Sequence, residues 1–363
     1  MALAGFAAFL PVIKERLHLS ASEVGDSILF SPLGAVLALP FLGKLIARFS
    51  SRRVLGWAGT GLCIAMPFVI SAPTPWTLRL LLICSGAFVA SLDAAMNSEI
   101  VEVQKLYPTP IVSSAHGCWS LGGFVGGALV AATRKFDVSP TVHAVAASSV
   151  MLVALWIAES RMLPHADAVI DDSPAFALPR GPLILIGALM MLAMGSEGAG
   201  FDWIAVYLRQ SLQTSQALAA LGFGIFSGAM AASRLLGDLI VLKLGRKRTL
   251  QIGSVVASIG FLAGVSAPSP ALAIAGFVVG GFSIANIVPI LYQASGNVEG
   301  IPTGTGIAAV STMGYGMFFL APPMVGYIAD RMSLSVALGA FGCGVIGVAI
   351  WGPLVFKKSA IPT

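Results

Sequence analysis

Two ionisable side chains of this chain lie inside long apolar stretches. Asp93 is followed four residues later by Asn97, and Glu197 lies among glycines at positions 195, 198 and 200. A charge at the centre of a bilayer costs about 2.5–3.5 kcal/mol on insertion scales, so such residues usually face a cavity or a partner. Asp93 and Glu197 are therefore candidates for proton binding. An Asp93–Asn97 contact that only packs helices together is the alternative.

Further polar and aromatic residues have the spacing of a cavity lining. His116 is a candidate proton shuttle, or a hydrogen-bonded packing residue. Asn286 and Gln293 are seven residues apart and would share one helical stripe, with interhelical hydrogen bonding as the alternative. The predicted substrate-binding residues are Asn97, Trp119, Asp202, Trp203, Asn286, Gln293 and Tyr315.

Composition indicates which elements must position these residues. The 363-residue chain is 57% hydrophobic and only 10% charged, whereas a soluble domain carries about 25% charged residues. Apolar runs of helical length alternate with short polar breaks, which predicts an all-α integral membrane protein. We expect twelve transmembrane helices, near 1–16, 22–47, 54–72, 77–103, 111–133, 140–160, 182–208, 216–242, 249–266, 271–296, 304–329 and 334–356.

The chain also contains an internal repeat. The segment from Gly5 to Ser20 is echoed by the segment from Gly200 to Ser215, at a constant offset of 195 residues. Two weakly similar halves of a very apolar chain are typical of secondary transporters, with the substrate site between the repeats. The predicted organisation is a six-helix half at 1–161, a cytoplasmic linker at 162–180 and a second six-helix half at 181–363.

The first and the seventh predicted spans differ from the others. The first predicted span has only sixteen residues, or roughly 24 Å of helix against a hydrocarbon core of about 30 Å. We therefore expect that the chain lacks the start of its first helix. In the seventh span, glycines at 195, 198 and 200 would let the helix bend or break, as transporter gating helices do.

The basic residues predict an orientation rather than a nucleic-acid partner. The net charge is +5, but the lysines and arginines lie in short clusters between apolar runs. Thirteen fall in loops on one side of the predicted membrane and six on the other, and the richer side should be cytoplasmic. This places the C-terminus inside, in a multi-pass protein of a bacterial inner membrane.

Several motifs resemble those of the major facilitator superfamily. Residues 43–53 resemble its signature loop between helices two and three, and residues 237–247 resemble a second copy. Ala47 and Ser50 depart from the usual acidic residue and glycine of that loop. Residues 92–97, 113–123 and 197–208 are similar to YbjJ-like, fucose-permease-related bacterial transporters. The resemblance implies two six-helix bundles and a cytoplasmic latch, to which we assign Arg48, Arg52, Arg234 and Asp238, with Arg234 and Asp238 as an i, i+4 ion pair.

The sequence thus predicts a monomeric, proton-coupled secondary transporter of a small polar solute. Paired amides favour a sugar-like solute, whereas efflux of a drug or metabolite is the alternative within transport. A non-transporting membrane sensor is the alternative from another class. The chain contains no metal motif, phosphate loop or nucleophile elbow, so we expect no cofactor and no enzyme activity.

Overall fold

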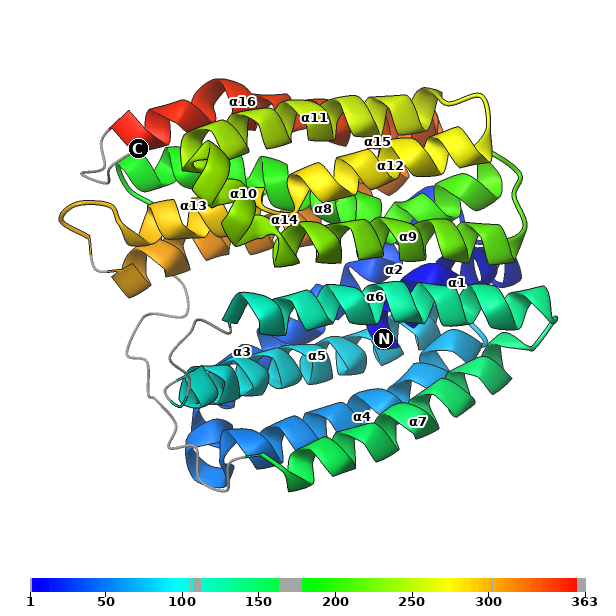
Figure 1. Ribbon diagram of the computed structural model, residues 1–363. Coiled ribbons are helices and arrows are strands. Elements are labelled where there is room, and N and C mark those ends of the chain that lie inside the picture. The colour runs from blue at the N-terminus through cyan, green and yellow to red at the C-terminus, as the bar shows by residue number, and fades with distance from the viewer. Residues whose placement is uncertain (1, 105, 107–111, 163–177, 302, 358–363) are drawn as a thin grey trace.

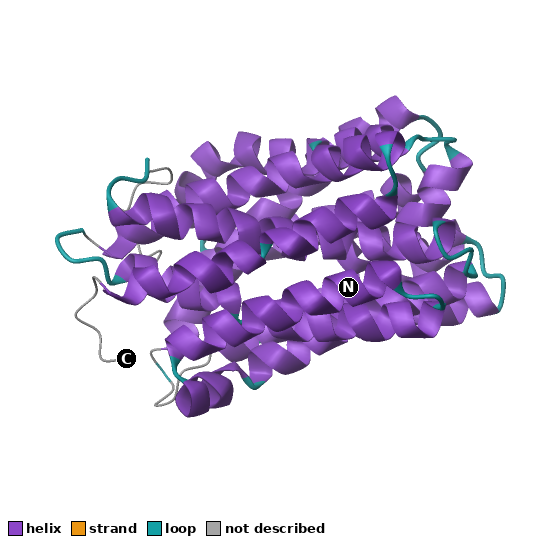
Figure 2. Cartoon of the chain, turned by 90° about the horizontal axis from the view of Figure 1, so that it is seen from above, coloured by secondary structure: helices purple, strands orange, loops and turns teal. Residues whose placement is uncertain are grey.

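The structure is a computed structural model that describes residues 2–104, 106, 112–162, 178–301 and 303–357. Within these ranges it contains helices and no strand, and Figure 2 shows the helices lying side by side with the loops gathered at two ends. The α-helices are α1 (Ala2–Arg16), α2 (Ala21–Ile28), α3 (Phe30–Phe49), α4 (Ser51–Ser71), α5 (Pro75–Gln104), α6 (Val112–Lys135), α7 (Pro140–Ser160), α8 (Pro182–Gln210), α9 (Gln216–Leu235), α10 (Gly237–Leu244), α11 (Arg246–Ser266), α12 (Pro270–Ile284), α13 (Ile287–Gly296), α14 (Thr303–Arg331), α15 (Leu334–Gly344) and α16 (Ile346–Trp351), and a 3₁₀ helix follows at Gly352–Lys357.

Each predicted span is helical, but the number of membrane-crossing helices is smaller than twelve by length and composition. Nine helices among the described residues are long and apolar enough to cross a bilayer. A tenth is obtained if Ala21–Ala38 and Pro40–Ile46, which meet at 53°, form one broken span. The helix α1 has 15 residues, fewer than the roughly 20 needed to span, and the glycine-rich α6 is also outside these nine. The count of twelve and the missing helix start therefore stay predictions.

The helices form two bundles, shown one above the other in Figure 1. The bundle drawn below contains α4, α5, α6 and α7, and the one above contains α8 to α16. We call the end where α3 ends at Phe49 and α11 begins at Arg246 the basic end, and the end where α1 ends at Arg16 and α8 ends at Gln210 the opposite end. Most of the predicted linker lies at 163–177, outside the described residues, so the domain boundaries also stay predictions.

Serine caps show that the internal repeat extends to local structure. Ser20 accepts a hydrogen bond from the backbone of Glu23 at the start of α2, and Ser215, 195 residues later, accepts one from Leu218 at the start of α9. Each cap satisfies a backbone N–H that the first turn of a helix leaves unpaired. The two halves therefore begin their second long helical segment in the same way.

A second pair of equivalent positions lies in the two signature loops. Ser50 and Gly245, again 195 residues apart, have φ/ψ of 73°/152° and 75°/156°. This region of backbone conformation is essentially restricted to glycine, because a Cβ clashes there. The first half therefore has a serine in a backbone conformation that suits glycine, and the second half has a glycine there.

Replacing Ser50 with glycine should therefore stabilise the protein, by about 1–3 kcal/mol if the strain is fully relieved. The reciprocal change, Gly245→Ser, should destabilise it by a similar amount. Thermal unfolding of the purified protein in detergent measures both. A lower melting temperature for Ser50→Gly would contradict the strain argument.

The two halves touch most closely along α6 and α9, where glycines allow the backbones to approach. A Cβ added to Gly127 of α6 would lie 2.6 Å from the Cα of Gly224 in α9. Near the opposite end, Gly25 of α2 packs against the carbonyl of Pro322 in α14. In a bilayer, where the hydrophobic effect does not drive helix association, small residues at such crossings favour tight packing.

Polar contacts close the opposite end between the halves. Glu15 of α1 forms an ion pair with Arg209 of α8 at 2.7 Å. Gln216 donates to Glu15 at 3.4 Å and accepts from Arg134 at 2.8 Å. Asp330 of α14 accepts from the backbone N–H groups of residues 21 and 22, at 2.9 and 2.8 Å, at the start of α2. We call these contacts the opposite-end network.

Candidate functional site

Asp93 and Asn97 lie on one face of α5, as their spacing predicts, but their bond is not side chain to side chain. The amide nitrogen of Asn97 donates to the backbone carbonyl of Asp93 at 2.9 Å. Asp93 is half-buried and lies near the middle of α5.

Glu197 forms an ion pair with Arg234 that the sequence did not predict. An Nη of Arg234 in α9 donates to Glu197 of α8 at 2.7 Å, and its other terminal nitrogen donates to Ser120 of α6 at 2.7 Å. The two side chains of the ion pair are 21% and 18% exposed. Since Ser120 belongs to the first half of the chain and Glu197 to the second, Arg234 joins the two halves.

The Glu197–Arg234 pair overturns the predicted pairing of Arg234 with Asp238. Those residues are four apart in sequence, but α9 ends at Leu235 and α10 begins at Gly237, so the continuous helix that the i, i+4 contact needs is absent. Asp238 is exposed instead. Arg234 therefore lies inside the bundle and is not paired with Asp238, and the latch role assigned to the two residues stays a prediction.

Two tyrosines extend this polar region toward Asp93. A side-chain hydrogen bond joins Tyr315 of α14 to Tyr292 of α13, and Ser311 donates to Tyr292 at 3.4 Å. Tyr292 interacts electrostatically with both Glu197 and Asp93, and Tyr315 with Asp93. Tyr292 is therefore within electrostatic range of a carboxylate from each half.

We call this set the central polar cluster. It unites three predicted site residues, Asp93, Glu197 and Tyr315, with Arg234 and with three residues that were not among the predicted ones: Ser120, Tyr292 and Ser311. Tyr292 had a usable signal, because it is a polar aromatic residue in an otherwise apolar helix. Single serines in membrane helices carry no such signal, since they also serve as small packing residues.

The predicted stripe on the tenth span does not form. The helix breaks between α12, which ends at Ile284, and α13, which begins at Ile287. Asn286 lies in the break, is buried, and donates to the hydroxyl and backbone carbonyl of Ser233 at 2.9 and 3.1 Å. Gln293 is exposed. Asn286 thus ties the α12–α13 break to the end of α9, which fits the alternative of interhelical hydrogen bonding.

The aromatic candidates differ in their surroundings. Trp203 is fully buried in the hydrophobic core of the second half, so direct contact with a solute was a wrong expectation for the structure described here. Trp119 is 39% exposed, next to Ser120 of the central polar cluster. Asp202 is only partly exposed. Trp119 therefore remains a candidate for solute contact, and Asp202 stays a prediction.

The glycines of the seventh span pack helices together and do not break α8. This helix is continuous over 29 residues. A Cβ on Gly195 would meet Met317, and one on Gly200 would meet Phe226, both at 2.9 Å. The predicted break is therefore absent, because these glycines let neighbouring side chains pack closely against an uninterrupted helix.

Three other predicted residues lie apart from the cluster. Arg48 is exposed near the end of α3, with its guanidinium carbon 5.2 Å from the ring centre of Phe49. Arg52 lies in the first turn of α4. Both are at the basic end, so their latch role stays a prediction. His116 belongs to α6, but its side chain is outside the described part of the structure.

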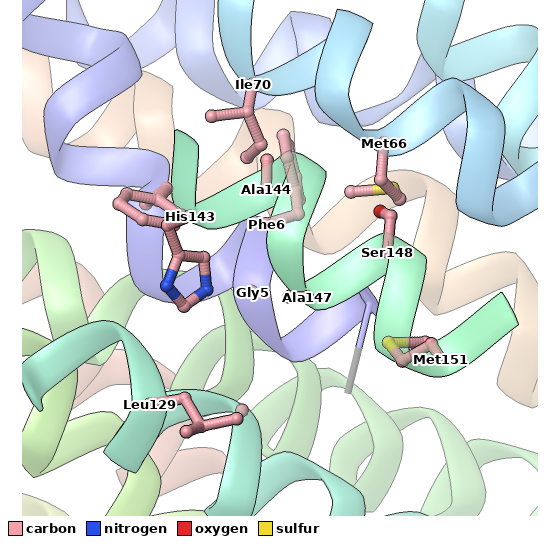
Figure 3. A pocket seen from close by; sticks show the side chains of 12 residues that line it. Gly5, Phe6, Met66, Ile70, Leu129, His143, Ala144, Ala147, Ser148 and Met151 are labelled. Atoms are coloured by element: carbon pink, nitrogen blue, oxygen red, sulfur yellow. The ribbon is translucent and has the colours of Figure 1, made fainter. Parts of the chain in front are cut away.

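A cavity in the first half is too small to be the solute site. Phe6, Met66, Ile70, Leu129 and His143 are among the residues around it (Figure 3), and its volume is about 30 Å³. Small-molecule pockets are usually about 300–1,000 Å³. His143 is buried and forms a 2.8 Å hydrogen bond with Thr133. The cavity has room for about one water molecule and not for a larger solute.

The described residues contain nine or ten helices that are long and apolar enough to cross a bilayer, packed around a partly buried ion pair and two tyrosines, which is the architecture of a multi-pass membrane protein. The family described as Major Facilitator Superfamily matches residues 1–322. The chain therefore belongs to the major facilitator superfamily. Members of this family are generally transporters and not enzymes.

Relatives and solved structures agree with this assignment. The chain is 35% identical to an uncharacterized MFS-type transporter of Yersinia pestis, over 96% of this chain and 91% of the relative. It is 28% identical to the membrane protein MosC of Rhizobium meliloti, over 93% and 83%.

Two solved structures share the fold. One is a bacterial homologue of the human lysosomal transporter Spinster, in an inward-facing and occupied conformation, with a TM-score of 0.75, 15% identity and coverage of 100% of this chain and 95% of that one. The other is a variant of the nucleoside transporter NupG, with a TM-score of 0.77, 15% identity and coverage of 98% and 97%.

Proposed function

We propose that the protein is a proton-linked secondary transporter that moves a small polar solute across a bacterial inner membrane by alternating access. The observation that carries this proposal is the partly buried contact in which Arg234 joins Glu197 of the second half to Ser120 of the first, with Asp93 and Glu197 both acting electrostatically on Tyr292. A carboxylate in such a place can bind and release a proton as its surroundings change. A site built from both halves changes when they move relative to each other.

The arrangement of contacts supports a definite state for this cycle. The opposite-end network closes that end, and we assign it to the outside because the basic end has the excess of lysine and arginine expected of the cytoplasmic side. In this orientation the C-terminus is cytoplasmic, and a monomer with two moving halves suffices. The protein would then be closed toward the outside, with the central polar cluster reached from the cytoplasm.

Transport in proteoliposomes tests the proposal. Counterflow and pH-jump assays against sugars, amino acids, nucleosides and drugs would identify a solute, and Asp93→Asn and Glu197→Gln would then be compared with wild type. We expect both variants to lose pH-driven accumulation, because neither amide can carry the proton. Glu299→Gln, which alters an exposed loop carboxylate, should behave as wild type. Proton coupling is refuted if both cluster variants keep full gradient-driven accumulation.

A further inference from the structure

A second cavity, much larger than the one beside His143, lies at the opposite end of the molecule. Its volume is about 530 Å³, and residues of α1, α6, α7 and α9 line it. This volume is within the range of small-molecule pockets, about 300–1,000 Å³. The lining residues are different from those of the central polar cluster, so the cavity is a separate place in the fold. We call it the opposite-end vestibule.

The lining of the opposite-end vestibule carries more positive than negative charge. Arg16 and Arg134 line it together with one carboxylate, that of Glu15. Glu15 already forms an ion pair with Arg209, at 2.7 Å. These four side chains therefore hold three positive charges and one negative charge.

Neutral acceptors hold both lining arginines. Arg16 donates to two backbone carbonyls at the end of α4, at 2.6 and 2.9 Å. Arg134 donates to the side-chain oxygen of Gln216 at 2.8 Å and to the backbone carbonyl four residues further along the chain at 2.7 Å. Within the described residues neither guanidinium forms an ion pair with a carboxylate. Both positive charges therefore remain to attract an anion.

The same bonds leave N–H donors for a ligand. A guanidinium has five N–H groups, and Arg134 uses only its Nε and one terminal nitrogen in bonds to the described residues. These bonds fix the plane of the guanidinium, so a carboxylate or phosphate group can form paired hydrogen bonds with it at a small cost in side-chain entropy. Arg134 is also partly buried, and solvent screens such a charge less than one on an open surface.

The opposite-end vestibule belongs to both halves of the chain. The helices α1, α6 and α7 come from the first half, whereas Gln216 begins α9 in the second. Gln216 accepts from Arg134 and donates to Glu15. A ligand on Arg134 would therefore lie beside a contact between the halves, and it would bind best while this end is closed.

From the size, charge and free donors of this cavity, we propose that the opposite-end vestibule is a second binding site, which takes a ligand through a carboxylate or phosphate group. The recognising groups are the guanidiniums of Arg16 and Arg134. The anionic group belongs to a soluble compound or to a phospholipid headgroup. Its binding favours the conformer that is closed at this end, and it needs no transport activity.

Binding to the purified full chain in phosphatidylcholine nanodiscs, at constant ionic strength, tests this site. The soluble probes are glucuronate and inorganic phosphate, titrated against the melting temperature. We expect at least one of them to raise it. A second set of nanodiscs contains phosphatidylglycerol. If the anionic group is that of a lipid, phosphatidylglycerol alone should raise the melting temperature and should compete with the soluble probes.

Variants of one lining arginine locate the binding. Arg134→Gln removes a positive charge and should weaken binding of the anion at least about tenfold. Lys135→Gln makes the same change of charge at the next residue, which is exposed and does not line the cavity, and should bind as wild type does. Arg134→Lys keeps the charge but loses the planar fork. It should bind more weakly than wild type, and it serves as the test if Arg134→Gln does not fold.

Glucose, the neutral counterpart of glucuronate, provides the last control, because any shift that it causes should be the same in wild type and in Arg134→Gln. Three results would overturn the proposal. In the first, neither soluble anion nor phosphatidylglycerol raises the melting temperature. In the second, the Arg134 variants bind the anion as tightly as wild type does. In the third, Lys135→Gln weakens binding as much as Arg134→Gln.

Discussion

Replacing Arg234 with methionine should lower the free energy of unfolding by up to about 3–5 kcal/mol, the usual effect of removing one partner from a buried ion pair. The two side chains are about one-fifth exposed, so we expect the lower end of this range. Glu197 would keep its charge without its cation, and the bond from Arg234 to Ser120 would be lost as well. Thermal or SDS-induced unfolding of the purified variant measures the change.

A double variant separates this charge effect from general damage. In Arg234→Met/Glu197→Leu no unpaired charge remains, so much of the stability should return. Arg209→Met is the matched control, because Arg209 pairs with Glu15 at the same 2.7 Å but the side chains are 29% and 37% exposed. Pairs exposed to this degree contribute only about 0.2–1 kcal/mol. If Arg234→Met and Arg209→Met lowered the free energy of unfolding equally, the Glu197–Arg234 pair would stabilise the protein no more than the exposed pair does.

Valine at Gly86 should prevent correct packing of the first half. A Cβ at Gly86 of α5 would overlap the backbone carbonyl oxygen of Ser31 in α3, and a Cβ at Gly34 of α3 would overlap that of Ile83 in α5. Backbone atoms cannot move aside as a flexible side chain can, so the helices must separate. Overpacking of ordinary cores costs about 1–3 kcal/mol, and the overlap here should exceed that range.

The facing helix, α3, provides the control. Gly43 of α3 has no atom within 4 Å of its added Cβ, and valine favours helix more than glycine does. Size-exclusion chromatography in detergent should show a normal folded peak for Gly43→Val and a reduced or aggregated one for Gly86→Val. If Gly86→Val gave a wild-type peak and melting temperature, the crossing of α3 and α5 would be looser than the structure shows.

Local signals in the sequence predicted the helices well. The span predicted at 140–160 coincides with α7, because a serine cap and Pro140 begin it and the apolar run sets its length. The repeat at an offset of 195 predicted equivalent positions, and the caps at Ser20 and Ser215 show that equivalence. Such features depend on neighbouring residues, which a sequence displays directly.

Local sequence signals could not predict the contacts between helices. Spacing suggested Asp238 as the partner of Arg234, but the rotation of α9 against α8 brings Glu197 to it instead. The break at Asn286 was equally hidden, because residues 285 and 286 include no proline or glycine. Asn286 satisfies its amide through Ser233, a contact that exists only after the helices have packed. The sequence could thus predict which residues belong to the site, but not which of them pair with each other.

The weakness of the opposite-end network has a consequence for energetics. Its ion pair, Glu15–Arg209, is partly exposed and so contributes only about 0.2–1 kcal/mol. In its other contacts, two neutral backbone N–H groups at the start of α2 donate to the carboxylate of Asp330. In the proposed alternating-access cycle, such small terms would keep the two conformers within a few kcal/mol of each other, so that both are populated. A solute that binds one conformer modestly better would then reverse the populations, and the gradient would need to supply only a small bias per cycle.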